Sequence, residues 1–142
     1  MGITRFAHYT VRSSNLEASW RFYERVLGLS VRTREGFPVP ACIVSADDVE
    51  VVHIFQASPE IDAALERLAS VKEDGVTWST GRLMHVEFWA TGLAQMKNRW
   101  TGDGVAFTER TLPDKHQVAL RDPDGIVVNL NFPLSEAGAS RA

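Results

Sequence analysis

The stretch "TRFAHYTVR", residues 4–12, decides the fold, because its single histidine, His8, recurs in the second half of the chain. The matching stretch is "GRLMHVEFWA", residues 81–90, where His85 also lies among apolar neighbours. The two histidines are separated by 77 residues (85 − 8). Both stretches have the composition of a β-strand, so the match indicates that one structural unit occurs twice.

A second match lies near the end of each half. When one residue is removed at the turn after the helix, the offset becomes 76 (129 − 53) and His53 falls on Asn129. The apolar pair Val51 and Val52 then falls on Val127 and Val128. The two halves therefore correspond in position as well as in the order of their elements.

Each half predicts a strand, a helix and three further strands. In the first half, residues 3–11 are strand-like, and Asn15 is a suitable cap for a helix that ends at Gly28. We expect the α+β class, with two tandem βαβββ modules (about 3–56 and 82–132) that form curved mixed β-sheets around a cavity and carry their helices outside. A connector helix over about 58–74 and a tail over 133–142 complete a single domain of 142 residues.

The composition excludes several classes of function. Fifteen Lys and Arg against 18 Asp and Glu give a net charge of −3, and without a basic run we expect neither nucleic acid nor a membrane as partner. The start "MGITRF" does not have the order of a signal peptide, so we expect a cytoplasmic protein. Cys42 is the only cysteine, and we expect it to be a small buried hydrophobic residue rather than a reactive thiol.

The repeat-related polar residues form the candidate site. Side chains alternate across a strand, so one sheet face packs against helices while the other carries His8, His53, His85 and Asn129. One such histidine alone is most often satisfied by a backbone carbonyl or by water. Three at related positions favour a divalent metal, because neutral imidazoles can satisfy one ion together.

The chain resembles the vicinal oxygen chelate superfamily, which includes glyoxalase I, extradiol dioxygenases, and fosfomycin and bleomycin resistance proteins. The resemblance rests on the duplicated βαβββ order, the paired histidines, the helix "RFYERVLGL" (21–29) and the hairpin "LRDPDGIVVNL" (120–130). It implies His8, His53 and His85 as ligands of Fe, Zn, Ni or Mn. It also implies a small-molecule substrate and a homodimer. Asn129 departs from the pattern, because the family usually has a glutamate there, so the site could hold metal less tightly or hold none.

Four further side chains complete the candidate site. Glu87 shares the strand face of His85, where it could replace a ligand, orient one or act as a general base, or be a solvated carboxylate. Phe55 and Trp89 share the faces of His53 and His85 and are candidates to line a substrate pocket. His116 has no counterpart in the first half, and either a surface or a substrate-contacting role is open to it.

Two hypotheses of function follow. The first is a metal-dependent enzyme that chelates two vicinal oxygens of an anionic substrate, as a lyase or isomerase or as a ring-cleaving dioxygenase. The second is a metal-free protein that binds a drug or an aromatic compound in the same cavity. The three histidines favour the enzyme, whereas Asn129 favours the binding protein.

Overall fold

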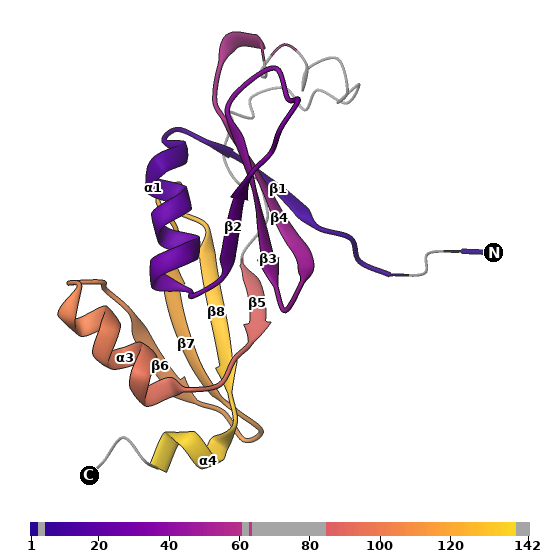
Figure 1. Cartoon of the computed structure of the whole chain (residues 1–142). Helices are drawn as coiled ribbons and strands as arrows, with labels where there is room; N and C mark the ends of the chain where they lie inside the picture. The colour runs from indigo at the N-terminus through magenta and orange to yellow at the C-terminus, as the bar shows by residue number, and fades with distance from the viewer. Residues whose placement is uncertain (3–4, 61–62, 64–84, 139–142) are drawn as a thin grey trace, which may run out of the picture. The chain divides into compact units, whose positions relative to one another are not determined.

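The computed structural model describes residues 1–2, 5–60, 63 and 85–138 (Figure 1). The chain divides into two compact units, Met1–Thr77 and Trp78–Ala142, each containing one of the predicted βαβββ modules. We call these units the first and the second module and describe each by itself. Most of the predicted connector helix lies outside the described residues, although residues 59, 60 and 63 are helical.

The first module is a four-stranded mixed sheet with a helix on one face (Figure 1). The spatial order is β1-β4-β3-β2, in which β1 runs parallel to β4 and the other neighbours are antiparallel. Its elements are β1 (Tyr9–Ser13), α1 (Leu16–Arg21), η1 (Phe22–Val26), β2 (Ser30–Thr33), β3 (Ala41–Ala46) and β4 (Val49–Gln56).

The second module repeats this arrangement, with the spatial order β5-β8-β7-β6 and β5 parallel to β8. Its elements are β5 (Val86–Trp89), α3 (Leu93–Gly102), β6 (Thr108–Thr111), β7 (His116–Arg121), β8 (Val127–Phe132) and α4 (Leu134–Ala137). The short helix α4 occupies part of the predicted tail. The α+β class with paired βαβββ modules is thus confirmed.

The strand register confirms the internal repeat. Thr10 pairs with His53 in the first sheet, and Glu87 pairs with Asn129 in the second. These pairs are related by the offsets of 77 and 76 residues that the sequence predicts (87 − 10 and 129 − 53). The correspondence therefore extends from chain position to strand pairing.

The predicted helix of the first module begins and ends where the sequence indicates. The side chain of Asn15 accepts a hydrogen bond from the Ala18 backbone N–H, and Gly28 adopts a φ of 73° where the helix ends. Its last turn, Phe22–Val26, is wound as a π-helix, which the spacing of apolar residues does not predict. Tyr23 and Leu27 bury the face that packs on the sheet.

Each sheet buries one face under its helix. In the first module, Val11, Val52 and Ile54 are buried on this side, and the hydroxyls of Ser13 and Ser19 lie 2.7 Å apart between strand and helix. Cys42 is fully buried in β3, and burial raises the pKa of its thiol to about 11, so the thiol stays protonated. Within the described part of the chain, no helix is long and apolar enough to cross a membrane.

Candidate functional site

The two histidines of the first module lie together on the sheet face opposite α1. The rings of His8 and His53 are stacked, with centroids 3.7 Å apart and planes 15° from parallel. His53 is 9% exposed and lies in β4, whereas His8 precedes β1 and is exposed. This contact brings two of the three predicted metal ligands into one cluster.

Both ring nitrogens of His53 have protein partners. Arg34 Nη1 lies 3.4 Å from His53 Nδ1, and His53 Nε2 lies 3.2 Å from a carboxylate oxygen of Glu50. A guanidinium can only donate, so His53 Nδ1 is the acceptor in this contact. The two contacts together fix the orientation of the His53 ring between Arg34 and Glu50.

Glu50 is held in its charged form by this contact. The hydrogen bond from His53 is the largest cause that keeps the pKa of Glu50 below its usual value, and Arg32, 2.6 Å away, adds to it. The Arg32 charge is thus balanced by Glu50, so Glu50 is already committed to an ion pair as well as to the histidine.

Phe55 lies on the same face and takes part in an aromatic cluster. Its ring stacks on Phe37 with centroids 4.5 Å apart, and the Arg34 guanidinium carbon lies 4.5 Å from the Phe37 centroid and 5.5 Å from that of Phe55. The prediction from strand alternation included Phe55 but not Phe37 or Arg34. Phe37 lies in the turn between β2 and β3, where no periodicity assigns a face.

In the second module, Glu87 is the centre of a hydrogen-bond network. Its carboxylate accepts from Asn131 Nδ2 at 3.0 Å, from Gln117 Nε2 at 3.2 Å and from Asn129 Nδ2 at 3.3 Å. The three amide residues are buried, with exposures of 2%, 3% and 5% respectively. Their donors are satisfied by a charged acceptor, which makes the hydrogen bonds stronger than those between neutral groups.

These donors stabilise the charged form of Glu87. The hydrogen bond from Asn131 is the largest cause that lowers the pKa of Glu87, with further lowering by Asn129, Lys115 and His85, while burial opposes the change. A carboxylate with a lowered pKa is a weak proton acceptor near neutral pH. The environment of Glu87 therefore suits fixed negative charge better than general-base catalysis.

The network continues across the sheet to β6. Gln117 Nε2 donates to Asn131 Oδ1 at 2.8 Å, and Arg110 donates to Gln117 Oε1 through Nε at 2.9 Å and Nη2 at 2.6 Å. Sequence reasoning did not select these residues, although strand alternation places Asn131 on the face of Asn129. Arg110 and Gln117 become neighbours only through the pairing of β6 with β7.

His85, which directly precedes β5, and Trp89 in β5 lie two residues before and after Glu87. His85 Nε2 lies 3.1 Å from Glu87 Oε1, and the Lys115 ammonium lies 3.8 Å from Glu87 Oε2 and 5.7 Å from the Trp89 ring centroid. Trp89 is 71% exposed. The predicted sharing of one face by His85, Glu87 and Trp89 agrees with this geometry.

His116 lies on the opposite face of the second sheet. Its Nδ1 lies 2.9 Å from the Thr111 hydroxyl, and its Nε2 lies 3.2 Å from Glu109, which is also bonded to Lys97 of α3. These contacts join β6, β7 and α3 on the helix side. The structure therefore places His116 on the sheet face opposite Glu87, and its role as a substrate contact stays a prediction.

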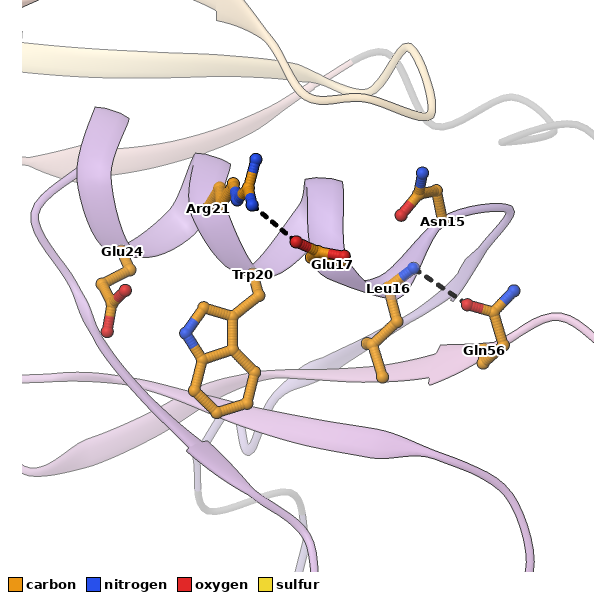
Figure 2. A pocket seen from close by; sticks show the side chains of 7 residues that line it. All are labelled: Asn15, Leu16, Glu17, Trp20, Arg21, Glu24 and Gln56. Atoms are coloured by element: carbon orange, nitrogen blue, oxygen red, sulfur yellow. Dashed lines mark hydrogen bonds and ion pairs between the residues drawn. The ribbon is translucent and has the colours of Figure 1, made fainter.

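A hollow on the helix side of the first module lies apart from the histidines. Figure 2 shows Leu16 and Trp20 pointing from the helix toward the strands, with Glu17 paired to Arg21 and the Leu16 N–H bonded to Gln56. The hollow is lined by Asn15, Leu16, Glu17, Trp20, Arg21, Glu24 and Gln56. Gln56 projects to the face opposite His53, so this hollow is separate from the candidate site.

The donor set of the first module does not fit a metal ion as it is arranged. A metal ligated by imidazole lies near the ring plane, about 2.1 Å from the nitrogen. The His8 and His53 rings are nearly parallel and stacked, so no point close to both nitrogens lies in both planes. Within either module, the described residues contain no group of three His, Cys, Asp or Glu side chains placed to hold a metal.

Solved structures share this fold of two βαβββ modules. A glyoxylase/bleomycin resistance protein/dioxygenase domain from Frankia sp. EAN1pec has a TM-score of 0.66 at 17% identity, over 93% of each chain. The antibiotic binding protein TnmS3 from Streptomyces sp. CB03234 has a TM-score of 0.65 at 20% identity, over 94% of this chain and 98% of its own. The fosfomycin resistance protein FosX from Listeria monocytogenes has a TM-score of 0.62 at 14% identity, over 95% and 98%.

The family follows from the sequence comparison. A family model described as the Glyoxalase/Bleomycin resistance protein/Dioxygenase superfamily matches residues 5–130, and the chain belongs to this superfamily. No curated protein matches the sequence at a significant level. The membership confirms the resemblance inferred from the histidines and the hairpin.

Proposed function

We propose that this chain binds a small organic molecule on the polar face of its first module without the help of a metal ion. One observation carries the proposal: both nitrogens of His53 are engaged, one by Glu50 and the other by the cationic Arg34. A guanidinium at a ring nitrogen competes with a metal cation for the same lone pair and repels its charge. The exposed His8 and the half-buried Phe55 leave this face able to contact a ligand.

The second module supports the same interpretation. Asn129 stands where a carboxylate would add negative charge, and its amide donates to Glu87. An amide also lends itself to recognising ligand oxygens and N–H groups. Neighbours of the same fold include a protein named as antibiotic binding, which is consistent with a binding role.

The test separates metal uptake from ligand binding. Protein purified without chelator or nickel affinity is assayed for bound metal and titrated with Fe²⁺, Zn²⁺, Ni²⁺ and Mn²⁺ by calorimetry. We expect no stoichiometric metal, and no difference in metal binding between wild type and His53→Ala. A thermal-shift screen of aromatic and anionic compounds in the presence of a chelator should identify ligands. A ligand present at 100 times its Kd stabilises the folded protein by about 2.7 kcal/mol, which such a screen detects.

The second candidate is a metal-dependent enzyme, either a lyase or isomerase or an extradiol-type dioxygenase. The repeat-related positions of His8, His53 and His85 favour it, with Glu87 as the catalytic carboxylate. Tight metal binding that is lost in His53→Ala but retained in His116→Ala would support it and overturn the first proposal. His116 is the matched control because it lies on the helix side.

We also propose that the chain forms a homodimer, as the resemblance implies. We further propose a cytoplasmic location, with neither nucleic acid nor a membrane as a partner. Light scattering after size exclusion measures the first, and a monomer of 15.8 kDa would contradict it.

A further inference from the structure

Arg34 is a cation whose surroundings in the first module prepare it to receive an anion. Its guanidinium lies over the Phe37 and Phe55 rings, and its one polar side-chain contact within the described residues is the 3.4 Å approach to His53 Nδ1. No carboxylate of the described residues lies within ion-pair distance of it, whereas Arg32 nearby is paired with Glu50. Among the described residues, most of the five N–H donors of the Arg34 guanidinium have no polar side-chain partner and can serve a ligand.

The internal repeat shows what Arg34 lacks. The position of Arg34 corresponds to Arg110 at the offset of 76 residues (110 − 34), and Ala41 corresponds to Gln117 (117 − 41). In the second module, the Gln117 amide oxygen accepts two hydrogen bonds from Arg110. In the first module, the methyl group of Ala41 stands there instead, so the acceptor that holds Arg110 has no counterpart beside Arg34.

The aromatic pair adds a second element of recognition. Phe37 and Phe55 occupy the place beside Arg34 where the second module has the polar Asn131 (131 − 55). Contact with the two rings restricts the motion of the guanidinium before a ligand binds. The guanidinium therefore loses less conformational entropy on binding. A guanidinium has the planar fork that matches a carboxylate, and the phenylalanines offer apolar surface to an aromatic ring.

We propose that Arg34, Phe37 and Phe55 form a binding site for small aromatic carboxylates, in which Arg34 receives the carboxylate and the phenylalanines contact the ring. This inference rests on the proposed function and names the class of ligand for the polar face of the first module. His53 contributes by fixing the guanidinium beside the rings. Arg34 is the cation that the charge of the ligand meets.

The experiment measures binding of 2-naphthoate by calorimetry, with 2-naphthamide as a neutral isostere and inorganic phosphate as an anion without a ring. We expect 2-naphthoate to bind at least 10-fold more tightly than either. Arg34→Met should weaken 2-naphthoate binding by 10- to 100-fold, which corresponds to a charged hydrogen-bonded contact. The affinity of Arg34→Lys for 2-naphthoate should lie between those of wild type and Arg34→Met, because lysine keeps the charge but loses the planar fork.

The matched control is Arg21→Met, which removes one positive charge from the helix side of the same module. It should leave 2-naphthoate binding within 2-fold of wild type, and Phe37→Leu should weaken 2-naphthoate binding but not phosphate binding. Equal binding of the acid and the amide, or unchanged binding in Arg34→Met, overturns this inference alone. If the chelator-treated screen finds ligands but 2-naphthoate does not bind, the inference fails while the proposed function stands.

Discussion

At the scale of single residues, Glu87 connects charge to stability in the second module. Its carboxylate is the acceptor for three amide side chains, and two of these, Asn129 and Asn131, project from β8. A buried amide without an acceptor costs about 1–3 kcal/mol, whereas a satisfied one costs little. Glu87 is therefore part of the sheet structure as well as a candidate for the site.

The substitution Glu87→Gln should lower the free energy of unfolding by about 1 kcal/mol at pH 7, because the new amide cannot accept from all three donors. The pKa of Glu87 is lowered in the folded state, so its contribution is present above the unfolded value of about 4.3 and disappears as the pH falls through the folded value. Urea unfolding of both proteins at pH 7 and at low pH measures this. A difference that persists unchanged in acid would contradict the explanation, and Glu17→Gln, in an exposed pair, serves as control.

A second residue-scale prediction concerns Asn129, where the family usually has a glutamate. Asn129→Glu places a second carboxylate within contact of Glu87, since the present amide nitrogen lies 3.3 Å from it. We expect a loss of about 2–4 kcal/mol at pH 7 that becomes smaller in acid, because like charges raise the pKa of one partner. Zn²⁺ should restore the stability by binding between the carboxylates and His85.

Thermal unfolding with and without Zn²⁺ distinguishes these effects, with Asn129→Ala as the variant that loses the donor without adding charge. Wild-type stability of Asn129→Glu at pH 7 would show that residue 129 does not face Glu87 closely in solution. A variant destabilised at pH 7 that Zn²⁺ leaves unchanged would remove residue 129 from any metal coordination shell.

At the scale of elements, helix α3 depends on a contact from the end of the chain. It begins after Gly92, whose φ of 82° and missing side chain provide no cap. The Glu136 carboxylate of α4 accepts instead from the backbone N–H groups of Gly92 and Leu93, at 2.8 and 2.7 Å. The negative charge of Glu136 also interacts favourably with the positive, N-terminal end of the helix dipole.

Glu136→Ala should therefore lower the free energy of unfolding by about 0.5–2 kcal/mol, as the loss of a capping residue does. Hydrogen exchange should become faster in the first turn of α3 before it changes elsewhere. Glu136→Gln is the matched variant, and it should recover part of the loss because its amide oxygen still accepts. Unaltered exchange at Leu93 in Glu136→Ala would contradict the capping role.

This contact also shows which elements the sequence could predict. The amphipathic helix before Gly28 and the paired strands carry local periodic patterns, so their positions follow from short windows of sequence. The helix α4 has four residues and its charge acts on a segment 43 residues away, so no local pattern indicates it. The π-helical turn at Phe22–Val26 likewise has no local signal in the spacing of the apolar residues.

At the scale of the whole molecule, the duplication explains both what was predicted in the site and what was not. The repeat offset predicted equivalent positions for His53 and Asn129. Alternation along the strands predicted that Phe55 shares the face of His53, and that Glu87 and Trp89 share the face of Asn129. Arg34, which follows β2, and Gln117 in β7 enter only through the topology of the sheets, which brings together residues with no fixed spacing in sequence. The convergence of all three histidines on one ion stays a prediction.

The two modules have diverged on their polar faces while keeping equivalent cores. Val52 and Val128 occupy matching places in β4 and β8, and both are completely buried. The polar faces differ, because an arginine and aromatic cluster in the first module corresponds to an amide and carboxylate network in the second. Conserving the core while changing one face is the outcome expected when stability and recognition depend on opposite sides of a sheet.

Val52→Ala and Val128→Ala test whether each module has its own cooperative core. Each substitution removes two buried methyl groups and should cost about 1–3 kcal/mol. Because the chain divides into two compact units, we expect faster hydrogen exchange mainly in the module that carries the substitution. The measurement compares amides of β3 and β7 in both variants. Equal loss of protection in both sheets from either substitution would mean that the modules unfold as one unit, and the duplicated sequence would then encode one cooperative structure rather than two.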